Sequence, residues 1–251
     1  MKNKPMENNE WKVQAKRIKE VLGLELSPVA IACLKEPVVG GDIPAGRIRM
    51  CRAILDAAAG NTLRLRKDNN ACFGADHNLG FSGFGGVKAA EQARQFVVEG
   101  EKLFCSYDAL DKLASQMSPV PDNSGSCFIL SPVENADFQA QLIVFICNAE
   151  EASRILSLAV FMDGIMPKLK IGGPTCRMAI LEPLLTGELN ISFYDYTSRR
   201  LCKVDKNKLL VSVPVNRMSA LAASLEKCSA GTAKVEYPRQ LRGLLRRNKE
   251  K

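Results

Sequence analysis

The sequence has little of what most metal and hydrolytic sites need. It contains a single histidine, His77, and the closest two of its nine cysteines, Cys33 and Cys51, are eighteen residues apart. These absences exclude metal sites built on several histidines, zinc ribbons with CxxC pairs and the short cysteine runs of bacterial ferredoxins. The odd cysteine count also argues against a complete disulfide framework. Any metal or redox site must therefore be assembled from distant segments.

Long apolar runs and familiar catalytic motifs are missing too. The best apolar run, residues 141–147, is far too short to span a bilayer, and the N-terminus lacks the apolar core of a signal peptide. There is no GxSxG nucleophile elbow and no GxxxxGK phosphate-binding loop. We therefore expect a cytoplasmic protein with no membrane partner.

The formal charge of +8 lies at the two ends of the chain. Residues 1–20 hold six basic and three acidic residues, and residues 239–251 hold six basic and one acidic. A nucleic-acid-binding domain normally keeps its excess charge in the folded part, where phosphates are bound. We therefore expect no specific nucleic-acid partner, a single domain over residues 1–238, and a basic, flexible tail over residues 239–251.

Hydrophobic periodicity predicts alternating helices and strands. The class is therefore α/β or mixed α+β, a single compact domain with a mixed central sheet flanked by helices. Ser106 and Thr175 are predicted helix N-caps. The predicted helices cover residues 8–22, 50–60, 87–103, 106–117, 149–162 and 217–227, and a further helix is predicted to start at Cys176. The predicted strands cover 28–34, 62–66, 127–130, 141–147, 169–171 and 209–215, and residues 186–192 are predicted to form a turn that leads into a strand. Residues 36–46 are predicted to form a loop.

Three cysteines differ from the other six in their local context. Cys51 and Cys176 are each predicted at a helix N-terminus and followed by Arg, a setting that lowers a thiol pKa and favours the thiolate. Cys72 lies beside a glycine-rich turn. The alternative is that all three are buried caps and core fillers. The others are predicted to be structural: Cys33, Cys105, Cys127, Cys147, Cys202 and Cys228.

A few polar residues are further candidates. His77 could be a fourth metal ligand, a proton donor or a hydrogen-bonded surface residue. The arginines Arg177, Arg199 and Arg200 could bind an anionic group, because guanidinium forks suit carboxylate and phosphate, or could form salt bridges. Two acidic residues near glycine turns could be acid/base groups or solvated surface residues: Asp76 and Glu188.

The runs 51–60, 63–80 and 176–199 resemble a prokaryotic family, domain of unknown function 169 (DUF169). The family's opening strand is matched by Ser27–Ile31, and the resemblance covers roughly residues 10–228. It implies an archaeal or anaerobic-bacterial protein, and His77 is not part of its pattern. The residues that match the pattern are Cys51, Gly60, Cys72, Gly80, Cys176, Pro183, Gly187 and Arg199.

Local context and the resemblance select the same three cysteines. Cys51, Cys72 and Cys176, without partner histidines, suit a [4Fe–4S] cluster better than zinc, which predicts a redox or cofactor-handling protein with a small-molecule or redox partner. The alternative is a binding module in which Gly80 and Arg199 hold a small anionic or haem-like cofactor without chemistry. A third reading, a thiol enzyme using Cys51 or Cys176, lacks a histidine base.

Overall fold

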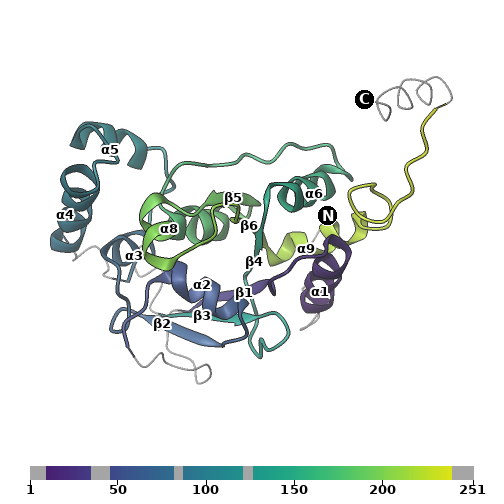
Figure 1. The fold of residues 1–251 in the computed structure, drawn as a ribbon, viewed down its shortest axis with the longest axis horizontal. Helices are drawn as coiled ribbons and strands as arrows, with labels where there is room; N and C mark the ends of the chain where they lie inside the picture. The colour runs from purple at the N-terminus through teal and green to yellow at the C-terminus, as the bar shows by residue number, and fades with distance from the viewer. Residues whose placement is uncertain (1–9, 35–45, 82–86, 121–126, 239–251) are drawn as a thin grey trace.

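Figure 1 shows the fold as a computed structural model that describes residues 10–34, 46–81, 87–120 and 127–238. The basic tail over residues 239–251 and nearly all of the predicted loop over 36–46 lie outside these ranges. Among the described helices, none is both long enough and apolar enough to cross a membrane.

Most elements lie where the hydrophobic pattern predicts them, and the Ser106 cap is confirmed, since its Oγ accepts from the Ala109 N–H. The helices are α1 (Glu10–Leu22), α2 (Met50–Ala58), α3 (Phe73–Asn78), α4 (Val87–Gln95), α5 (Tyr107–Ala114), α6 (Ala149–Val160), α7 (Glu182–Thr186), α8 (Tyr196–Cys202) and α9 (Val215–Ser224), with π-helical turns η1 (Phe96–Gly100) and η2 (Arg177–Leu181). The strands are β1 (Val29–Leu34), β2 (Leu63–Arg66), β3 (Cys127–Pro132), β4 (Leu142–Cys147), β5 (Asn190–Phe193) and β6 (Leu209–Pro214).

The described strands form one sheet in the order β2-β3-β1-β4-β6-β5. The mixed α+β class is confirmed, but the expected mixture of parallel and antiparallel strands is wrong, because neighbours run antiparallel in every pairing. A parallel pair needs a crossover that returns the chain to the same end of the sheet. Here the connections leave each pair of neighbouring strands running in opposite directions.

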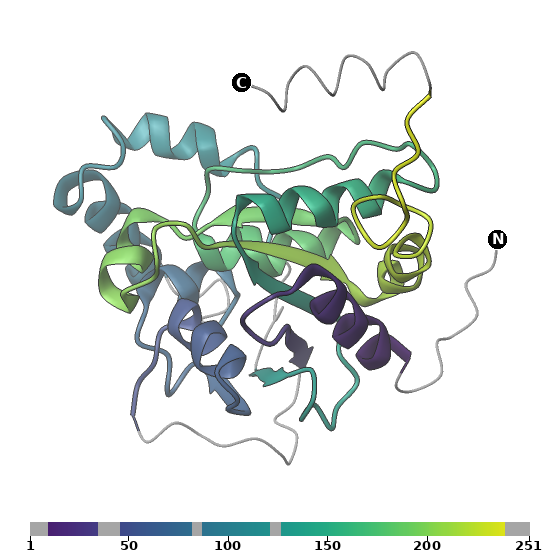
Figure 2. The same ribbon diagram turned by 45° about the vertical axis from the view of Figure 1, so that its right-hand side comes forward.

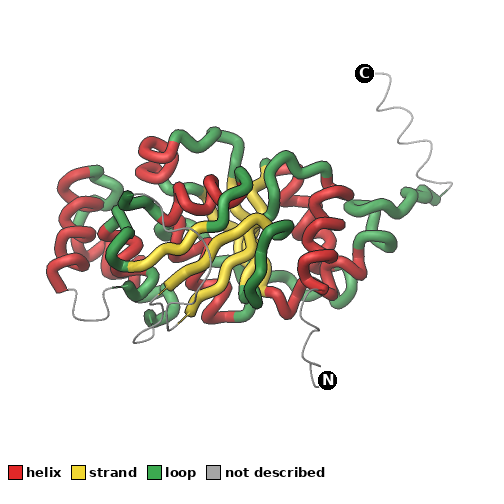
Figure 3. Tube along the Cα trace, turned by 90° about the horizontal axis from the view of Figure 1, so that it is seen from below, coloured by secondary structure: helices red, strands yellow, loops and turns green. Residues whose placement is uncertain are grey.

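Strand β4 is apolar throughout because both of its faces are buried. Phe145 belongs to a first core with α1, α6 and α9, whereas Val144 belongs to a second core with α2, α3, η2 and α8. Figures 2 and 3 show helices on both sides of the sheet. Successive side chains of a strand point to opposite faces, so one apolar run supplies both cores.

Residues 169–171 are not the strand that their apolar pattern predicts. Instead, the side chain of Asn190 on β5 acts as the neighbour of Lys170: its Oδ1 accepts from the Lys170 N–H at 2.9 Å. Its Nδ2 donates to the Lys170 carbonyl at 3.0 Å and to the Met178 carbonyl at 2.8 Å. Because a side-chain amide offers the same donor and acceptor as a peptide group, this segment is satisfied without joining the sheet.

Replacing Asn190 therefore tests what holds this segment. Asn190 is 4% exposed, so Asn190→Ala leaves backbone groups of Lys170 and Met178 without their partner. We expect a loss of about 1–3 kcal/mol in the free energy of unfolding, measured by urea denaturation. The exposed Asn207→Ala should change it by less than about 0.5 kcal/mol. Equal stability of the two variants would contradict the assignment.

Candidate ligand-binding pocket

A pocket of about 890 Å³ borders the second core. It lies where several segments far apart in the sequence meet: the start of α2, helix α3, the loop before η2, and the turn from β5 into α8. Its remaining wall comes from residues 87–120, here called the arm, which comprises α4, η1 and α5. In Figure 1 the arm lies at the side of the molecule farthest from α1. A volume of this size is typical of small-molecule sites.

The arm gives the pocket an apolar wall. None of its described apolar residues is buried, although the segment carries many large ones. Phe96 is 41% exposed and Leu103 is 42% exposed, and both line the pocket. Apolar surface of this kind is left accessible because it faces a cavity and not a packed core. The apolar residues of the arm that line the pocket are Ala90, Ala93, Phe96, Val97, Leu103, Phe104, Leu110, Leu113, Ala114 and Met117.

A buried carboxylate, Glu182, joins three segments next to the pocket, because it contacts the lining residues Ser118 and Arg177. Its Oε1 accepts from the Ser118 N–H at 2.7 Å and from Arg177 Nε at 3.1 Å. Its Oε2 accepts from the Ser118 hydroxyl at 2.7 Å and from Lys170 Nζ at 3.0 Å. Burial acts to raise the pKa of Glu182, but the hydrogen bonds from Ser118 and Lys170 and the charge of Arg177 outweigh it, so that pKa lies below its usual value.

Arg177 is held by this carboxylate through Nε alone. Its side chain is 2% exposed, it lines the pocket, and in the described part of the chain its two Nη groups have no hydrogen-bond partner. Burial, and then the charge of the neighbouring Arg177, lowers the pKa of His77, so both effects disfavour a second positive charge beside Arg177. The pocket therefore contains a buried cation with free donors.

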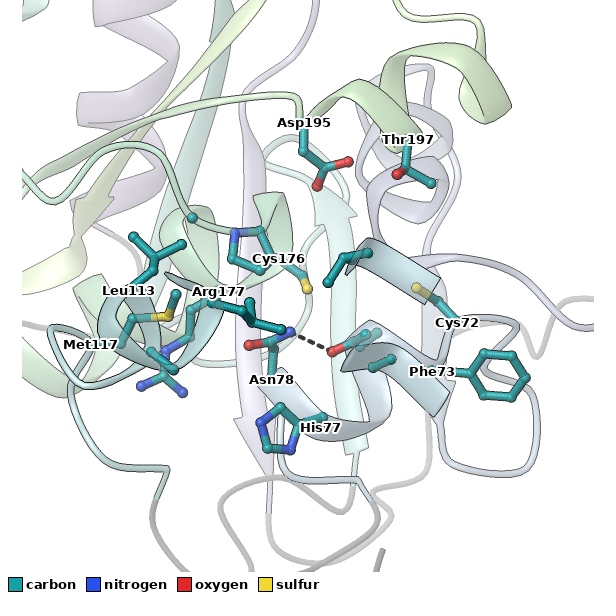
Figure 4. Close-up of a pocket in the computed structure, with 18 of the residues that line it drawn as sticks. Cys72, Phe73, His77, Asn78, Leu113, Met117, Cys176, Arg177, Asp195 and Thr197 are labelled. Atoms are coloured by element: carbon teal, nitrogen blue, oxygen red, sulfur yellow. Dashed lines mark hydrogen bonds between the residues drawn. The ribbon is translucent and has the colours of Figure 1, made fainter. Parts of the chain in front are cut away.

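Asp195 shapes the other side of the pocket by capping two helices. Its carboxylate accepts from the Thr175 N–H at 2.9 Å and from the Ser198 N–H at 2.7 Å, at the start of the helical segment before η2 and of α8. The prediction that Thr175 is an N-cap is wrong, because its hydroxyl donates to Asp195 instead. Figure 4 shows Cys176 between Asp195 on one side and Arg177 and His77 on the other.

All three predicted metal-ligating cysteines line this pocket. Cys51 lies in the first turn of α2, Cys72 is the N-cap of α3, and Cys176 directly precedes η2. The segment after Cys72 forms the short helix α3, and most of the glycine-rich turn, residues 82–86, lies outside the described residues. Cys202, which the sequence predicts to be structural, contacts one of these three cysteines: its Sγ is 3.4 Å from the Sγ of Cys51.

The predicted thiolate character of Cys51 and Cys176 is wrong. Burial, and then the charge of Cys72, raises the pKa of Cys176 well above its usual value. The hydrogen bond with Cys202, and then burial, raises the pKa of Cys51. Neither following arginine faces its cysteine, because Arg52 pairs with Asp56 and Arg177 pairs with Glu182. Burial at Cys176, and the contact with Cys202 together with burial at Cys51, therefore outweigh any effect of the helix N-terminus.

Cys72 and Cys202 differ in the direction of their pKa. Burial raises the pKa of Cys72. The pKa of Cys202 is lowered, chiefly because the Cys51 thiol donates to it and also because Arg49 and Arg52 are nearby. In the described ranges, no group of three or more His, Cys, Asp or Glu side chains is placed to hold a metal ion.

The two predicted cofactor-binding residues lie apart from the pocket lining. Arg199 donates through Nε to the Tyr194 carbonyl and through its Nη groups to the carbonyls of Asp205 and Lys208, at 2.9–3.0 Å. These bonds hold the chain around α8. Gly80 follows α3 with φ +75°, a conformation that suits glycine in a turn. Glu182 and Asp195 were missed, although Asp195 three residues before Ser198 is a typical N-cap spacing.

Removing the charge of Glu182 tests its role. Glu182→Gln leaves Arg177 buried without a counter-charge, so we expect a loss of about 3–5 kcal/mol in the free energy of unfolding at pH 7. The folded pKa is lowered, so the contribution of Glu182 is present above the unfolded carboxyl pKa and is lost as pH falls through the folded value. The acid-induced decrease in stability should therefore be smaller in the variant than in the wild type.

The matched control is Glu188→Gln, which removes a carboxylate that pairs with Arg217 and is 41% exposed. Exposed ion pairs contribute little, so this variant should lose less than about 1 kcal/mol. Urea denaturation between pH 3 and pH 8 measures both variants. Equal losses for the two would show that the Glu182 carboxylate is not the centre of the buried contacts.

Comparison with known proteins places the chain in a family. The sequence model of DUF169, described as uncharacterised ArCR, matches residues 17–224. Among curated proteins and among solved structures, none matches the chain. The match spans most of the chain, including every described residue of the pocket, and the chain therefore belongs to the DUF169 family.

Proposed function

We propose that the protein binds a small molecule with an apolar body and an anionic group, and that the anionic group pairs with Arg177. The observation that carries the proposal is the state of this side chain, which is 2% exposed, lines the pocket and uses only Nε within the described residues. Arg177 has a counter-charge in Glu182, but leaving its two buried Nη donors without hydrogen-bond partners is costly. A ligand anion at the two Nη groups removes that cost.

The geometry of a guanidinium favours a planar oxyanion. Two Nη donors in one plane match the two oxygens of a carboxylate, and such bidentate pairs are among the stronger hydrogen bonds. Each carboxylate oxygen of Glu182 already accepts two hydrogen bonds, so Glu182 does not also accept from the two Nη groups. The anion must therefore come from outside this cluster.

The arm supplies the surface for the rest of the ligand. Its side chains offer apolar contact and few free polar groups, since the guanidinium of Arg94 is already engaged by the carboxylate of Asp111. Each methylene that leaves water contributes about 0.8 kcal/mol. A medium-length aliphatic or aromatic carboxylate thus combines the two features of the pocket, an apolar wall and a buried cation.

Octanoate and 1-octanol are matched probes for this function. They share one apolar chain and differ in the group that would meet Arg177. We expect calorimetric titration to give at least about tenfold tighter binding of octanoate, because a hydrogen bond to a charged group contributes about 1.5–3 kcal/mol. Hexanoate should bind more weakly than octanoate. Arg177→Met should abolish the preference for the carboxylate, and Arg177→Lys should retain part of it.

The control is Arg94→Met, which removes a second arginine of the pocket lining whose guanidinium is already paired with Asp111. This variant should keep the preference for octanoate. Urea denaturation establishes that each variant is folded. The proposal is wrong if wild-type protein binds both probes equally, or if Arg94→Met and Arg177→Met lose the preference together.

The [4Fe–4S] cluster remains a second hypothesis, and one observation favours it: Cys51, Cys72 and Cys176 line the same pocket. Three soft thiolates suit such a cluster. Because no metal-binding group is placed among the described residues, these side chains would have to move together to hold it. The cluster and the carboxylate ligand would then occupy neighbouring parts of one cavity.

Anaerobic reconstitution with iron and sulfide tests the cluster. We expect a brown protein whose visible absorption is lost in Cys72→Ser and kept in Cys228→Ser, because Cys228 lies in the first core away from the pocket. Protein that stays colourless rules the cluster out and leaves the octanoate result unaffected.

A further inference from the structure

Two cysteine sulfurs are in direct contact below the pocket. Cys51 Sγ and Cys202 Sγ are 3.4 Å apart, although 151 residues separate them in the chain. Cys51 is in the first turn of α2 and Cys202 is the last residue of α8, and these two helices pack against each other (Figure 1). A disulfide needs an S–S distance of about 2.05 Å, so closure requires a sulfur movement of only about 1.4 Å.

The surroundings of the pair contain an unused hydrogen-bond donor. The Tyr194 side chain is 2% exposed, and its hydroxyl is buried without a hydrogen-bond partner in the described structure. It lies close enough for charges on Cys51 and Cys202 to affect it, and the Ser198 hydroxyl acts to lower the pKa of Cys51. Buried donors normally have acceptors. A sulfur anion or a sulfenic oxygen in this pair would supply one.

The pair is also within reach of a small reagent, because Cys51 forms part of the pocket lining. Arg49 and Arg52 lie near Cys202 and favour negative charge on its sulfur. The buried cysteines of the first core, Cys147 and Cys228, have no such access. The Cys51–Cys202 pair therefore combines three features: the sulfurs are in contact, Cys51 lines the pocket, and the nearby Tyr194 hydroxyl has no hydrogen-bond partner in the described structure.

We propose that Cys51 and Cys202 form a redox-active pair that a hydroperoxide oxidises to a disulfide. One sulfur, as thiolate, attacks the peroxide: an S–O bond forms, the O–O bond breaks, and the leaving alkoxide or hydroxide takes the proton that the thiol released. The second thiol then attacks the sulfenic sulfur, which forms the S–S bond and releases water. The thiols lose two electrons and the peroxide gains them.

The test uses the full chain, reduced and then treated with one equivalent of hydrogen peroxide. Trypsin cleaves after Arg49, Arg52, Arg200 and Lys203. Mass spectrometry should therefore find the peptide Met50–Arg52 joined to Leu201–Lys203 as the main product. A dithiol reductant should restore both free thiols.

Single variants separate the two steps. Cys51→Ser and Cys202→Ser should each lack the linked peptide and leave a sulfenic acid on the remaining sulfur, which dimedone traps. Cys228→Ser should form the disulfide as the wild type does. Tyr194→Phe, which removes the orphan hydroxyl, should slow the oxidation several-fold and leave the disulfide possible.

Two results would overturn the proposal. One is wild-type protein in which Cys51 joins Cys72 or Cys176 in preference to Cys202. The other is reaction of Cys51 and Cys202 no faster than that of the exposed Cys105, which serves as an internal reference for an ordinary surface thiol. Both are read from the wild-type protein, so neither depends on a variant that folds poorly, and neither bears on octanoate binding.

Discussion

The carboxylate of Glu182 is the contact on which the pocket depends. It joins the end of the arm through Ser118, the segment at Lys170 and the π-helical turn at Arg177. These segments share no strand pairing, and the second of them is kept beside the sheet by Asn190. By engaging Nε, Glu182 also sets the direction of the Arg177 guanidinium. The buried ion pair and the proposed ligand-binding cation therefore share one side chain, Arg177, and a buried pair of this kind is sensitive to loss of either partner.

The pocket also depends on the edge of the sheet. Strand β5 is short, and the residues at its end diverge: Phe193 lines the pocket, Tyr194 is buried beside the two thiols, and Asp195 caps two helices. Because successive residues of an extended chain point in opposite directions, Phe193 and Asp195 line the pocket whereas Tyr194 between them is buried. The apolar wall, the thiol pair and the helix starts are thus built around a single stretch of backbone.

The sequence predicted the elements better than the contacts among them. Periodicity located α1, α6 and the central strand β4, since each buries a regular face. Local context also brought Cys51, Cys72 and Cys176 together as one group, and all three line one pocket. What it missed was set by distant partners. Glu182 meets Ser118 across 64 residues, and Cys51 meets Cys202 across 151. The predicted lowering of the Cys51 and Cys176 pKa values was wrong for the same reason. Burial and the contact between Cys51 and Cys202 arise only in the folded chain, so local sequence does not reveal them.

The arm and the contacts of Glu182 with Ser118, Lys170 and Arg177 impose different evolutionary constraints. The apolar residues of η1 and α5 are not buried, so substitutions along these two elements can change the shape of the wall at little cost to folding. The contacts of Glu182 allow no such freedom, since its hydrogen bonds from Ser118 and Lys170 join it to two other segments of the chain. If the pocket binds the proposed carboxylate ligand, sequence change in the arm would alter which hydrophobic body fits, while Arg177 would keep the same requirement for a charged end.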